Sequence, residues 1–194
     1  MNFPVLAAFI IFIFSGSLLA QDQPATVALS VPDIEVVNQD GRHLRFNSQV
    51  IDGRIAIVTG FFTTCSSMCP ITQEKLSKVA KLLGPRLGKD VVIVSVSVDP
   101  QNDTPTRMKD WGEKFHIGAG WTLLSGNPAE VDTLLKSLGL SVPLPQRHQS
   151  ALMVGSAASG WVRISSWTSA EKLARLVESM SSAKAVANAS MHRQ

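Results

Sequence analysis

The sequence predicts an α/β fold in which helices cover both faces of a central sheet. Two runs carry this prediction: residues 55–62, "IAIVTGFF", and residues 91–98, "VVIVSVSV", are apolar and rich in β-branched residues. Such runs are typical of central strands that are buried on both faces. Each is followed by a stretch with helical periodicity, and strands that alternate with helices pair in parallel through right-handed crossovers.

The chain is expected to open with a β-hairpin. Residues 33–46, "DIEVVNQDGRHLRF", alternate about Asp40 and Gly41, a typical hairpin turn. The strand at 55–62 then leads into a helix that has Pro70 in its first turn and ends at Gly84 and Pro85. The apolar face of that helix is formed by Leu76, Val79, Ala80 and Leu83.

Two further helices carry clear start signals. Thr104 before Pro105 predicts one helix, and Asn127 before Pro128 predicts another that closes at Gly139. Residues 121–126, "WTLLSG", form a short strand between them. The apolar stripes are Met108, Trp111 and Phe115 in the first helix, and Val131, Leu134, Leu135 and Leu138 in the second.

The last third of the chain is predicted to form a hairpin and a closing helix. Residues 151–156 and 161–165 are the hairpin strands, and Thr168 with Glu171 is expected to cap the helix, whose apolar face ends near Met180. The resulting order is ββ-β-α-β-α-β-α-ββ-α. This is the order of a thioredoxin-like three-layer sandwich with an added N-terminal β-hairpin and an extra strand-helix insertion.

The first twenty residues predict export. They contain no charged side chain, and the apolar run 5–14 is followed by small residues, as in a secretory signal. Residues 1–20 are also barely long enough to act as a membrane anchor, so either a cleaved signal peptide or a retained anchor is expected. The remainder, periplasmic or otherwise extracytoplasmic, is divided into a linker at 21–30, one domain at 31–181 and a flexible tail at 182–194.

Composition excludes some classes of function. The 194-residue chain has a formal net charge of +3, and its lysines and arginines are scattered. Because no basic cluster with interleaved aromatic residues is present, nucleic acid is not an expected partner. The chain has 2 cysteines, too few for the disulfide framework that stabilises small exported proteins. The cysteines are therefore expected to perform chemistry.

Both cysteines lie in "FFTTCSSMCPIT", between the first central strand and the following helix. Reactive groups of open α/β sheets gather at this position. Because Cys69 is expected near the helix N-cap and Cys65 just above it, both thiols should be more acidic than a free cysteine. The C-x-x-x-C spacing lets two thiolates hold one soft ion, Cu(I) or Zn(II), and still permits a reversible disulfide. A plain structural disulfide is the alternative.

A third ligand should come from a histidine. His43 in the first hairpin, His116 near a helix end and His192 in the tail have ordinary structural explanations. His148 directly precedes the final hairpin, and in a thioredoxin-like sandwich the loop entering that hairpin faces the cysteine loop. We therefore predict a metal site made of Cys65, Cys69 and His148.

These residues resemble the Sco/SenC family of copper-binding, thioredoxin-like proteins over residues 33–180. "FFTTCSSMCP" resembles its C-x-x-x-C-P loop, "VSVSVDPQNDTP" its S-V-D-P-x-x-D-T-P segment, and His148 its downstream histidine. The resemblance implies that Cys65, Cys69 and His148 bind one copper ion and that Asp99 and Asp103 shape the neighbouring loop. It also implies a role in building the binuclear copper centre, CuA, of cytochrome c oxidase.

Some residues depart from the family pattern. Arg147 precedes the histidine where an acidic residue is common, Ser66 follows the first cysteine where proline is frequent, and the chain has no tyrosine. An arginine beside the site favours charged thiolates and disfavours Cu(II) relative to Cu(I). Asp99, at the end of the second central strand, is expected to support the metal ligands, and Asp103 is expected to be a loop and helix-cap residue.

Three functions follow from this site. The first is a metallochaperone that binds Cu(I), with Cu(II) as an alternative, and passes it to an apo-cytochrome c oxidase subunit or another exported cuproprotein. The second is a thiol-disulfide oxidoreductase in which Cys65 and Cys69 reduce the copper-ligand cysteines of the client. The third is a peroxide-reducing or redox-sensing protein. The first two imply an upstream copper donor or an upstream thiol reductant.

Overall fold

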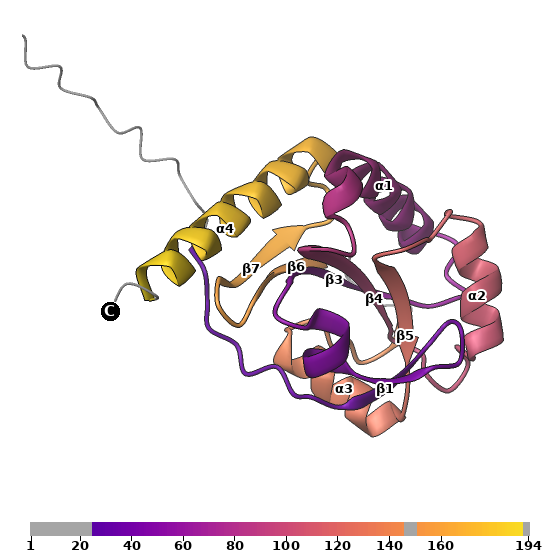
Figure 1. Ribbon diagram of the computed structural model, residues 1–194. Coiled ribbons are helices and arrows are strands. Elements are labelled where there is room, and N and C mark those ends of the chain that lie inside the picture. The colour runs from indigo at the N-terminus through magenta and orange to yellow at the C-terminus, as the bar shows by residue number, and fades with distance from the viewer. Residues whose placement is uncertain (1–24, 146–150, 192–194) are drawn as a thin grey trace, which may run out of the picture.

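The computed structural model describes residues 25–145 and 151–191, which contain one mixed seven-stranded sheet in the order β2-β1-β5-β4-β3-β6-β7 (Figure 1). The strands are β1 (Glu35–Asn38), β2 (His43–Arg45), β3 (Ile55–Phe61), β4 (Val91–Ser97), β5 (Trp121–Ser125), β6 (Ala151–Ser156) and β7 (Gly160–Ser165). β3, β4 and β5 are parallel, and the other neighbouring strands pair antiparallel. The predicted α/β class is confirmed.

Helices cover both faces of the sheet. They are α1 (Met68–Leu83), α2 (Pro105–Glu113), α3 (Pro128–Ser137) and α4 (Ala170–Met191), with a π-helical turn η1 (Phe46–Ile51) and a 3-10 turn η2 (Gly84–Arg86). α1 and α4 lie together on one face, and α3 lies on the other (Figure 1). Residues of η1 pack into the same core cluster as α3.

The two cores are built from alternate residues of the same strands. In β3, Ile55 and Ile57 pack with α1 and α4, whereas Ala56 and Val58 pack with α3. All of β3 is buried, which explains its continuous apolar sequence. Leu76 of α1 and Leu173 of α4 are 0% exposed, and burying each contributes about 1.5–3 kcal/mol.

Side-chain caps start α2 and α3 at the predicted places. Thr104 Oγ1 accepts a hydrogen bond from the Arg107 N–H, and Asn127 Oδ1 accepts one from the Ala129 N–H. Before α4, however, Ser169 Oγ accepts from the Lys172 N–H at 3.3 Å. Ser169 therefore caps α4 in place of the predicted Thr168, which lies within the preceding turn.

α4 is longer than the sequence pattern predicts. A flexible tail was expected at 182–194, but the helix continues to Met191. The reason is that residues 181–191 contain no glycine or proline and are rich in alanine, the strongest helix former. Within the described part of the chain, no helix is both long and apolar enough to cross a membrane.

The π-helical turn η1 was not predicted. It follows β2 and buries Phe46, Val50 and Ile51. Its start is fixed by Asp33, whose Oδ1 accepts hydrogen bonds from the N–H groups of Asn47 at 2.8 Å and Ser48 at 2.9 Å. A residue 14 positions away in sequence thus caps this turn, which local periodicity does not reveal.

Candidate metal centre

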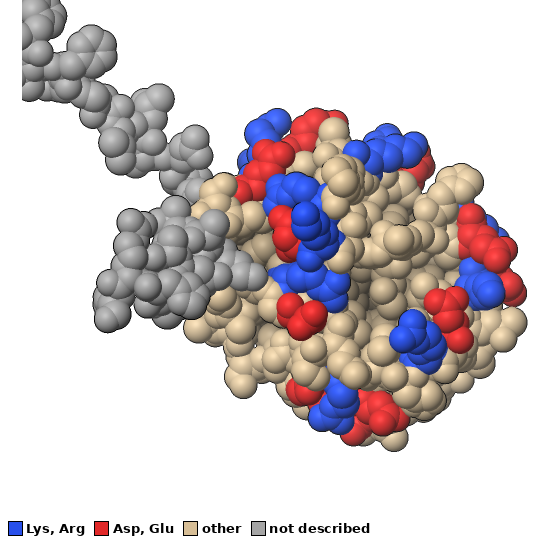
Figure 2. Space-filling model, viewed as in Figure 1, with Lys and Arg blue, Asp and Glu red and all other residues tan. Residues whose placement is uncertain are grey.

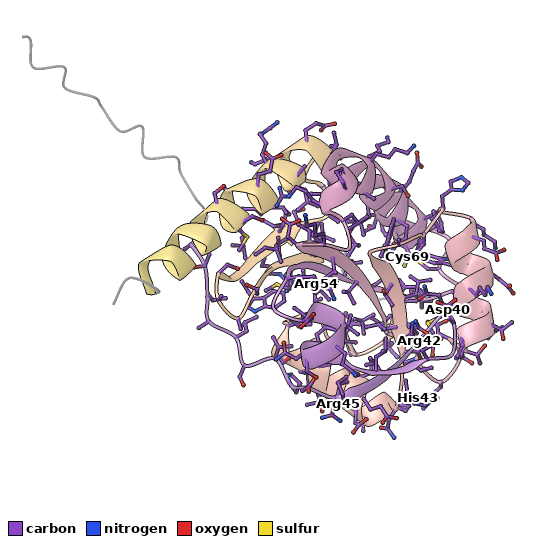
Figure 3. The ribbon with its side chains drawn as sticks, viewed as in Figure 1. Asp40, Arg42, His43, Arg45, Arg54 and Cys69 are labelled. Atoms are coloured by element: carbon purple, nitrogen blue, oxygen red, sulfur yellow. The ribbon has the colours of Figure 1, made fainter. Side chains whose placement is uncertain are left out.

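The two cysteines meet at the carboxyl end of β3. Cys65 lies in the loop after the strand, and Cys69 lies in the first turn of α1 (Figure 3). The Cys69 N–H points to the Cys65 Sγ at 3.4 Å, and both residues are free thiols. The arrangement therefore brings two sulfur atoms to one helix N-terminus, as the sequence predicts.

The helix begins slightly earlier than expected. α1 starts at Met68 after Ser67, so Cys69 is the second helical residue rather than the N-cap, and Pro70 is the third. Proline is tolerated there because the N–H groups of the first turn have no partner within the helix. Ser67 makes no side-chain capping bond, which leaves the first N–H groups of the helix available to the sulfurs.

The two thiols differ in acidity. Although partial burial opposes ionisation of Cys65, hydrogen bonds from the Cys69 thiol and from the Ser67 and Cys69 backbones lower its pKa. Burial, the Cys65 thiol and the charge of Asp103 together raise the pKa of Cys69. The expectation of two acidified thiols is therefore confirmed for Cys65 and wrong for Cys69, because desolvation outweighs the helix N-terminus there.

Apolar side chains surround the buried thiol. Cys69 is 2% exposed and belongs to a cluster with Phe61, Phe62, Met108, Trp111 and Leu123. The ring centroids of Phe61 and Trp111 are 4.9 Å apart, and Phe115 contacts Trp111 in a tilted arrangement with centroids 4.6 Å apart. Cys65, by contrast, is half-buried. One sulfur is thus open to a partner, and the other is enclosed on the protein side.

Asp103 holds the cysteine loop in place through hydrogen bonds. Its side chain is 1% exposed, and its Oδ1 accepts hydrogen bonds from the Thr63 N–H at 3.0 Å and from the Thr63 hydroxyl at 2.6 Å. Its Oδ2 accepts from the Ser97 hydroxyl at 2.5 Å. This buried carboxylate ties the loop after β3 to the end of β4 and lies near enough to Cys69 to affect its ionisation.

The family resemblance implied that Asp103 shapes the neighbouring loop, but its hydrogen bonds to Thr63 and Ser97 were not predicted. A signal was present: Thr63 and Ser97 are hydroxyl residues at the ends of two adjacent, apolar, parallel strands. Buried hydroxyls need hydrogen-bond partners, and an aspartate six residues after Ser97 is within reach of both.

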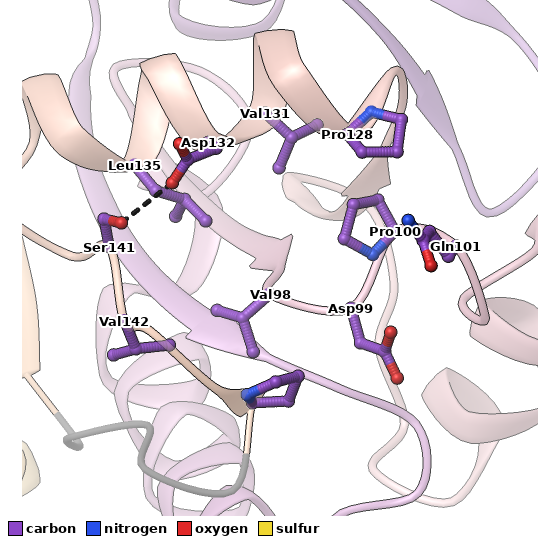
Figure 4. A pocket seen from close by; sticks show the side chains of 11 residues that line it. Val98, Asp99, Pro100, Gln101, Pro128, Val131, Asp132, Leu135, Ser141 and Val142 are labelled. Carbon is purple, nitrogen blue, oxygen red and sulfur yellow. Dashed lines mark hydrogen bonds between the residues drawn. The ribbon is translucent and has the colours of Figure 1, made fainter.

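Asp99 takes a different position. Its carboxylate accepts two hydrogen bonds from the Asn102 side-chain amide, each at 2.9 Å. It lines a cavity of about 240 Å³ between the loop after β4, α3 and the segment ending at Pro145, in which Ser141 is bonded to Asp132 (Figure 4). Support of the metal ligands by Asp99 stays a prediction.

His148, together with Arg147, lies outside the described residues, which end at 145 and resume at 151. The flank that follows is near the carboxyl end of β3, where Leu152 of β6 pairs with Thr59, and Pro145 before the gap lines the cavity with Val98 and Asp99 after β4. Among the described residues, no group of three histidine, cysteine, aspartate or glutamate side chains is placed to hold a metal ion. His43 instead bonds Glu35 at 2.9 Å in the first hairpin.

The fold and the thiol pair define a thioredoxin-like α/β protein with a dithiol at the start of a helix. Comparison with known families specifies it further, because the SCO1/SenC family model matches residues 23–159. The chain belongs to the SCO1/SenC family. The resemblance drawn from the three motifs is thereby confirmed.

Curated relatives agree with this assignment. The SCO1 protein homolog of Bacillus subtilis is 28% identical over 150 residues, 76% of each chain. A SCO2-like protein of Rickettsia conorii is 30% identical over 102 residues, which is 51% of this chain and 46% of the relative. For several relatives, this chain spans only about half of their length.

Solved structures share the fold. BsSco, described as a member of the Sco family of cytochrome c oxidase assembly proteins with a disulfide switch, is 25% identical with a TM-score of 0.70, covering 84% of this chain and 99% of BsSco. Copper-bound ScoI of Bradyrhizobium japonicum is 21% identical with a TM-score of 0.63, covering 79% of this chain and 99% of ScoI. The latter likeness concerns the fold.

Proposed function

We propose that this protein is a copper carrier that binds one Cu(I) through Cys65, Cys69 and His148 and delivers it to an exported cuproprotein. The client that fits best is the apo subunit that receives the CuA centre of cytochrome c oxidase. The observation that carries the proposal is the pair of reduced sulfurs at the start of α1 in a chain of the SCO1/SenC family. A copper-bound structure and an oxidase assembly protein are among its structural neighbours.

The chemistry of the donors suits this cargo. Thiolates are soft ligands and select Cu(I) over harder cations, and a neutral imidazole completes a three-coordinate set. Cys65, with its lowered pKa and partial exposure, is the sulfur that an incoming ion meets first and that a client thiolate can reach. Cys69 binds from the apolar side, and its proton leaves as the metal bond forms. A client thiolate then displaces one ligand at a time from the open side.

A Cu(I) titration of the reduced protein tests the ligand set. One equivalent should bind, binding should be lost in Cys65→Ser and Cys69→Ser, and affinity should fall at least tenfold in His148→Ala. His43→Ala is the matched control, because His43 lies in the first hairpin and pairs with Glu35. Unchanged affinity in the His148 variant would remove the imidazole from the ligand set.

The protein is proposed to work outside the cytoplasm, with residues 1–20 as a cleaved signal or a membrane anchor. The charge-free apolar start of the chain supports export. A structural neighbour is a SCO1/SenC family lipoprotein from Bacillus anthracis, 24% identical with a TM-score of 0.69, covering 84% of this chain and 99% of that protein. Fusion of residues 1–30 to a reporter that is active only after export tests this, and an inactive fusion contradicts it.

A dithiol reductant is the second candidate, favoured by the unequal thiols. The Cys65 thiolate attacks a client disulfide and releases one client thiol; Cys69, after losing its proton, attacks Cys65 Sγ and releases the other. The client gains two electrons, this protein is left with a Cys65–Cys69 disulfide, and an upstream dithiol donor must restore it. The disulfide switch named for BsSco suits this cycle.

Alkylation distinguishes the two thiols. With limiting iodoacetamide at neutral pH, mass spectrometry should find Cys65 modified well before Cys69, because its pKa is lowered and it is more exposed. Equal labelling would exclude an attacking and a resolving thiol. Reduction of an oxidised CuA-domain disulfide by the protein with turnover would then favour the reductant over the copper carrier.

A further inference from the structure

Trp167 has an unusual environment for a large apolar side chain. It is 75% exposed, whereas Trp111, Trp121 and Trp161 are each at most 5% exposed. A tryptophan buries about 150–250 Å² of surface when it is covered. A single exposed apolar residue is normal on a protein surface, so the position and the neighbours of Trp167 decide whether it has a function.

The turn that carries Trp167 is held firmly. The Trp167 N–H donates to the Ser165 hydroxyl at 3.2 Å, and the Thr168 N–H donates to the Ser165 carbonyl at 3.0 Å. Ser166 is 3% exposed, so its side chain is covered by the protein, and the capped start of α4 follows at Ser169. The indole is thus presented in water on an ordered turn, which reduces the entropy lost when a partner covers it.

Trp167 is at the same end of the sheet as the cysteines. Thr59 of β3 pairs with Leu152 of β6, and Leu152 pairs with Ile164 of β7. Neighbouring strands are about 4.8 Å apart, so the end of β7 is roughly 10 Å from the end of β3, where the cysteine loop begins. α4 therefore starts beside α1, and its later residue Ser181 accepts a hydrogen bond from Arg86, which follows α1.

Two more exposed apolar side chains lie at this end. Ile71, two residues after Cys69, and Leu144, in the segment that lines the cavity beside Asp99, are each 52% exposed. Among the described residues, five large apolar side chains are exposed, and these two and Trp167 are three of them. We call Ile71, Leu144 and Trp167 the apolar rim.

Charges next to the apolar rim indicate what kind of partner covers it. The adjoining faces of α1 and α4 carry both signs, and Glu171 of α4 interacts with Arg175 and with Lys78 of α1. Figure 2 shows acidic and basic side chains interspersed on these helices. Apolar side chains beside a mixed polar surround are typical of protein interfaces, whereas an anionic bilayer selects an excess of basic residues.

We propose that the apolar rim is the docking surface for the protein that receives copper, with Trp167 as its principal contact. This inference rests on the proposed function and adds where the client binds. The client would present a small apolar patch beside its ligand cysteines. Docking on Ile71 and Trp167 would hold those cysteines over Cys65, the exposed sulfur of the pair.

Copper transfer measures the contribution of Trp167. Wild-type protein and Trp167→Ala are each loaded with one equivalent of Cu(I) and mixed with the apo CuA domain of oxidase subunit II. Loading should be unchanged, while the domain concentration that gives half-maximal transfer should rise at least tenfold, as for an interface hot spot. Leu82→Ala is the matched control: Leu82 is on α1, 53% exposed, and at the far end of the helix.

Transfer that is equal in wild type and Trp167→Ala overturns the docking surface but leaves the copper carrier standing. Failure of the wild type to load copper overturns the proposed function instead. Acrylamide quenching gives an independent measurement, because Trp167 is the exposed tryptophan among the four. Its quenching should fall when the apo CuA domain is added; a fall with anionic vesicles alone, or with rising concentration of this protein alone, contradicts a client surface.

Discussion

At the residue scale, burial gives the two thiols different acidities, although the sequence predicts that both are acidified. Cys65 and Cys69 share one loop and one helix N-terminus, yet the pKa of Cys65 is lowered and that of Cys69 is raised. The difference arises because Cys69 sits in an apolar cluster and near the carboxylate of Asp103. The exposed thiol can ionise to meet a metal or a disulfide, while the buried one ionises when a metal or a disulfide exchange compensates for it.

Replacing Asp103 by asparagine should weaken the fold and make the Cys69 thiol more acidic. In Asp103→Asn, one acceptor oxygen and the negative charge are lost, so part of the bonding to Thr63 and Ser97 disappears. The free energy of unfolding should fall by about 1–3 kcal/mol, and the pKa of Cys69 should decrease. Urea denaturation of the reduced, metal-free protein and alkylation at several pH values measure the two effects.

Asp99→Asn is the matched control for Asp103→Asn. The Asp99 carboxylate bonds the exposed side-chain amide of Asn102, so its removal should change the unfolding free energy by about 0.5 kcal/mol or less. Equal effects of the two variants would contradict the role of Asp103 in holding the cysteine loop.

The sequence identifies the chemistry of the cysteines but not their environments. The spacing of Cys65 and Cys69 and their place before a helix are local features, so they can be read directly. The raised pKa of Cys69 depends on Met108, Trp111 and Leu123, which come from two other elements. Asp103 was likewise assigned to a cap because its partner Thr63 is 40 residues away. Long-range contacts decide both properties.

At the scale of elements, apolar periodicity and capping residues predicted nearly every strand and helix, but they did not predict η1. A six-residue π-helical turn has no apolar period that distinguishes it from a loop. It is stable here because it buries Phe46 and because Asp33 binds the free N–H groups at its start. Asp33 also accepts from the Ser48 hydroxyl at 2.8 Å.

The Asp33 cap predicts a pH-dependent stability. Hydrogen bonds from the Ser48 N–H and hydroxyl and the Asn47 N–H, with Arg45 nearby, outweigh the opposing effect of burial and lower the pKa of Asp33 below 3.8. A lowered pKa in the folded state means that the stabilisation is complete above the unfolded pKa of about 4 and is lost as pH falls through the folded pKa. Asp33→Asn should therefore be less stable than wild type at pH 7, and the difference should shrink below about pH 4.

Urea denaturation between pH 7 and pH 2.5 measures this dependence. Asp110→Asn, an exposed position on α2, is the control and should show a smaller difference at every pH. A difference between Asp33→Asn and wild type that stays constant down to pH 2.5 would show that the carboxylate charge has no part in capping η1.

At the scale of the whole molecule, one edge of the sheet carries the proposed chemistry. The cysteine loop, Asp103, the cavity beside Asp99 and the turn of Trp167 all follow the carboxyl ends of β3, β4 and β7 or face them. The topology brings them together, because β3 and β4 are parallel and β6 returns beside β3. The fold class and this edge could be predicted from strand order alone, whereas the exposure of Trp167 depends on how its turn packs.

This arrangement predicts that copper stabilises the entire domain. If Cys65, Cys69 and His148 bind one ion, the ion links α1 to the segment before β6, and unfolding must break that link. At a free Cu(I) concentration 100 times the dissociation constant, binding adds about 2.7 kcal/mol, equivalent to a rise in Tm of about 5–10 °C for a domain of this size. The rise should be absent in Cys65→Ser, reduced in His148→Ala and complete in His43→Ala. Calorimetry with buffered Cu(I) measures the change in Tm. An equal rise in wild type and Cys65→Ser would show that the metal binds at another site.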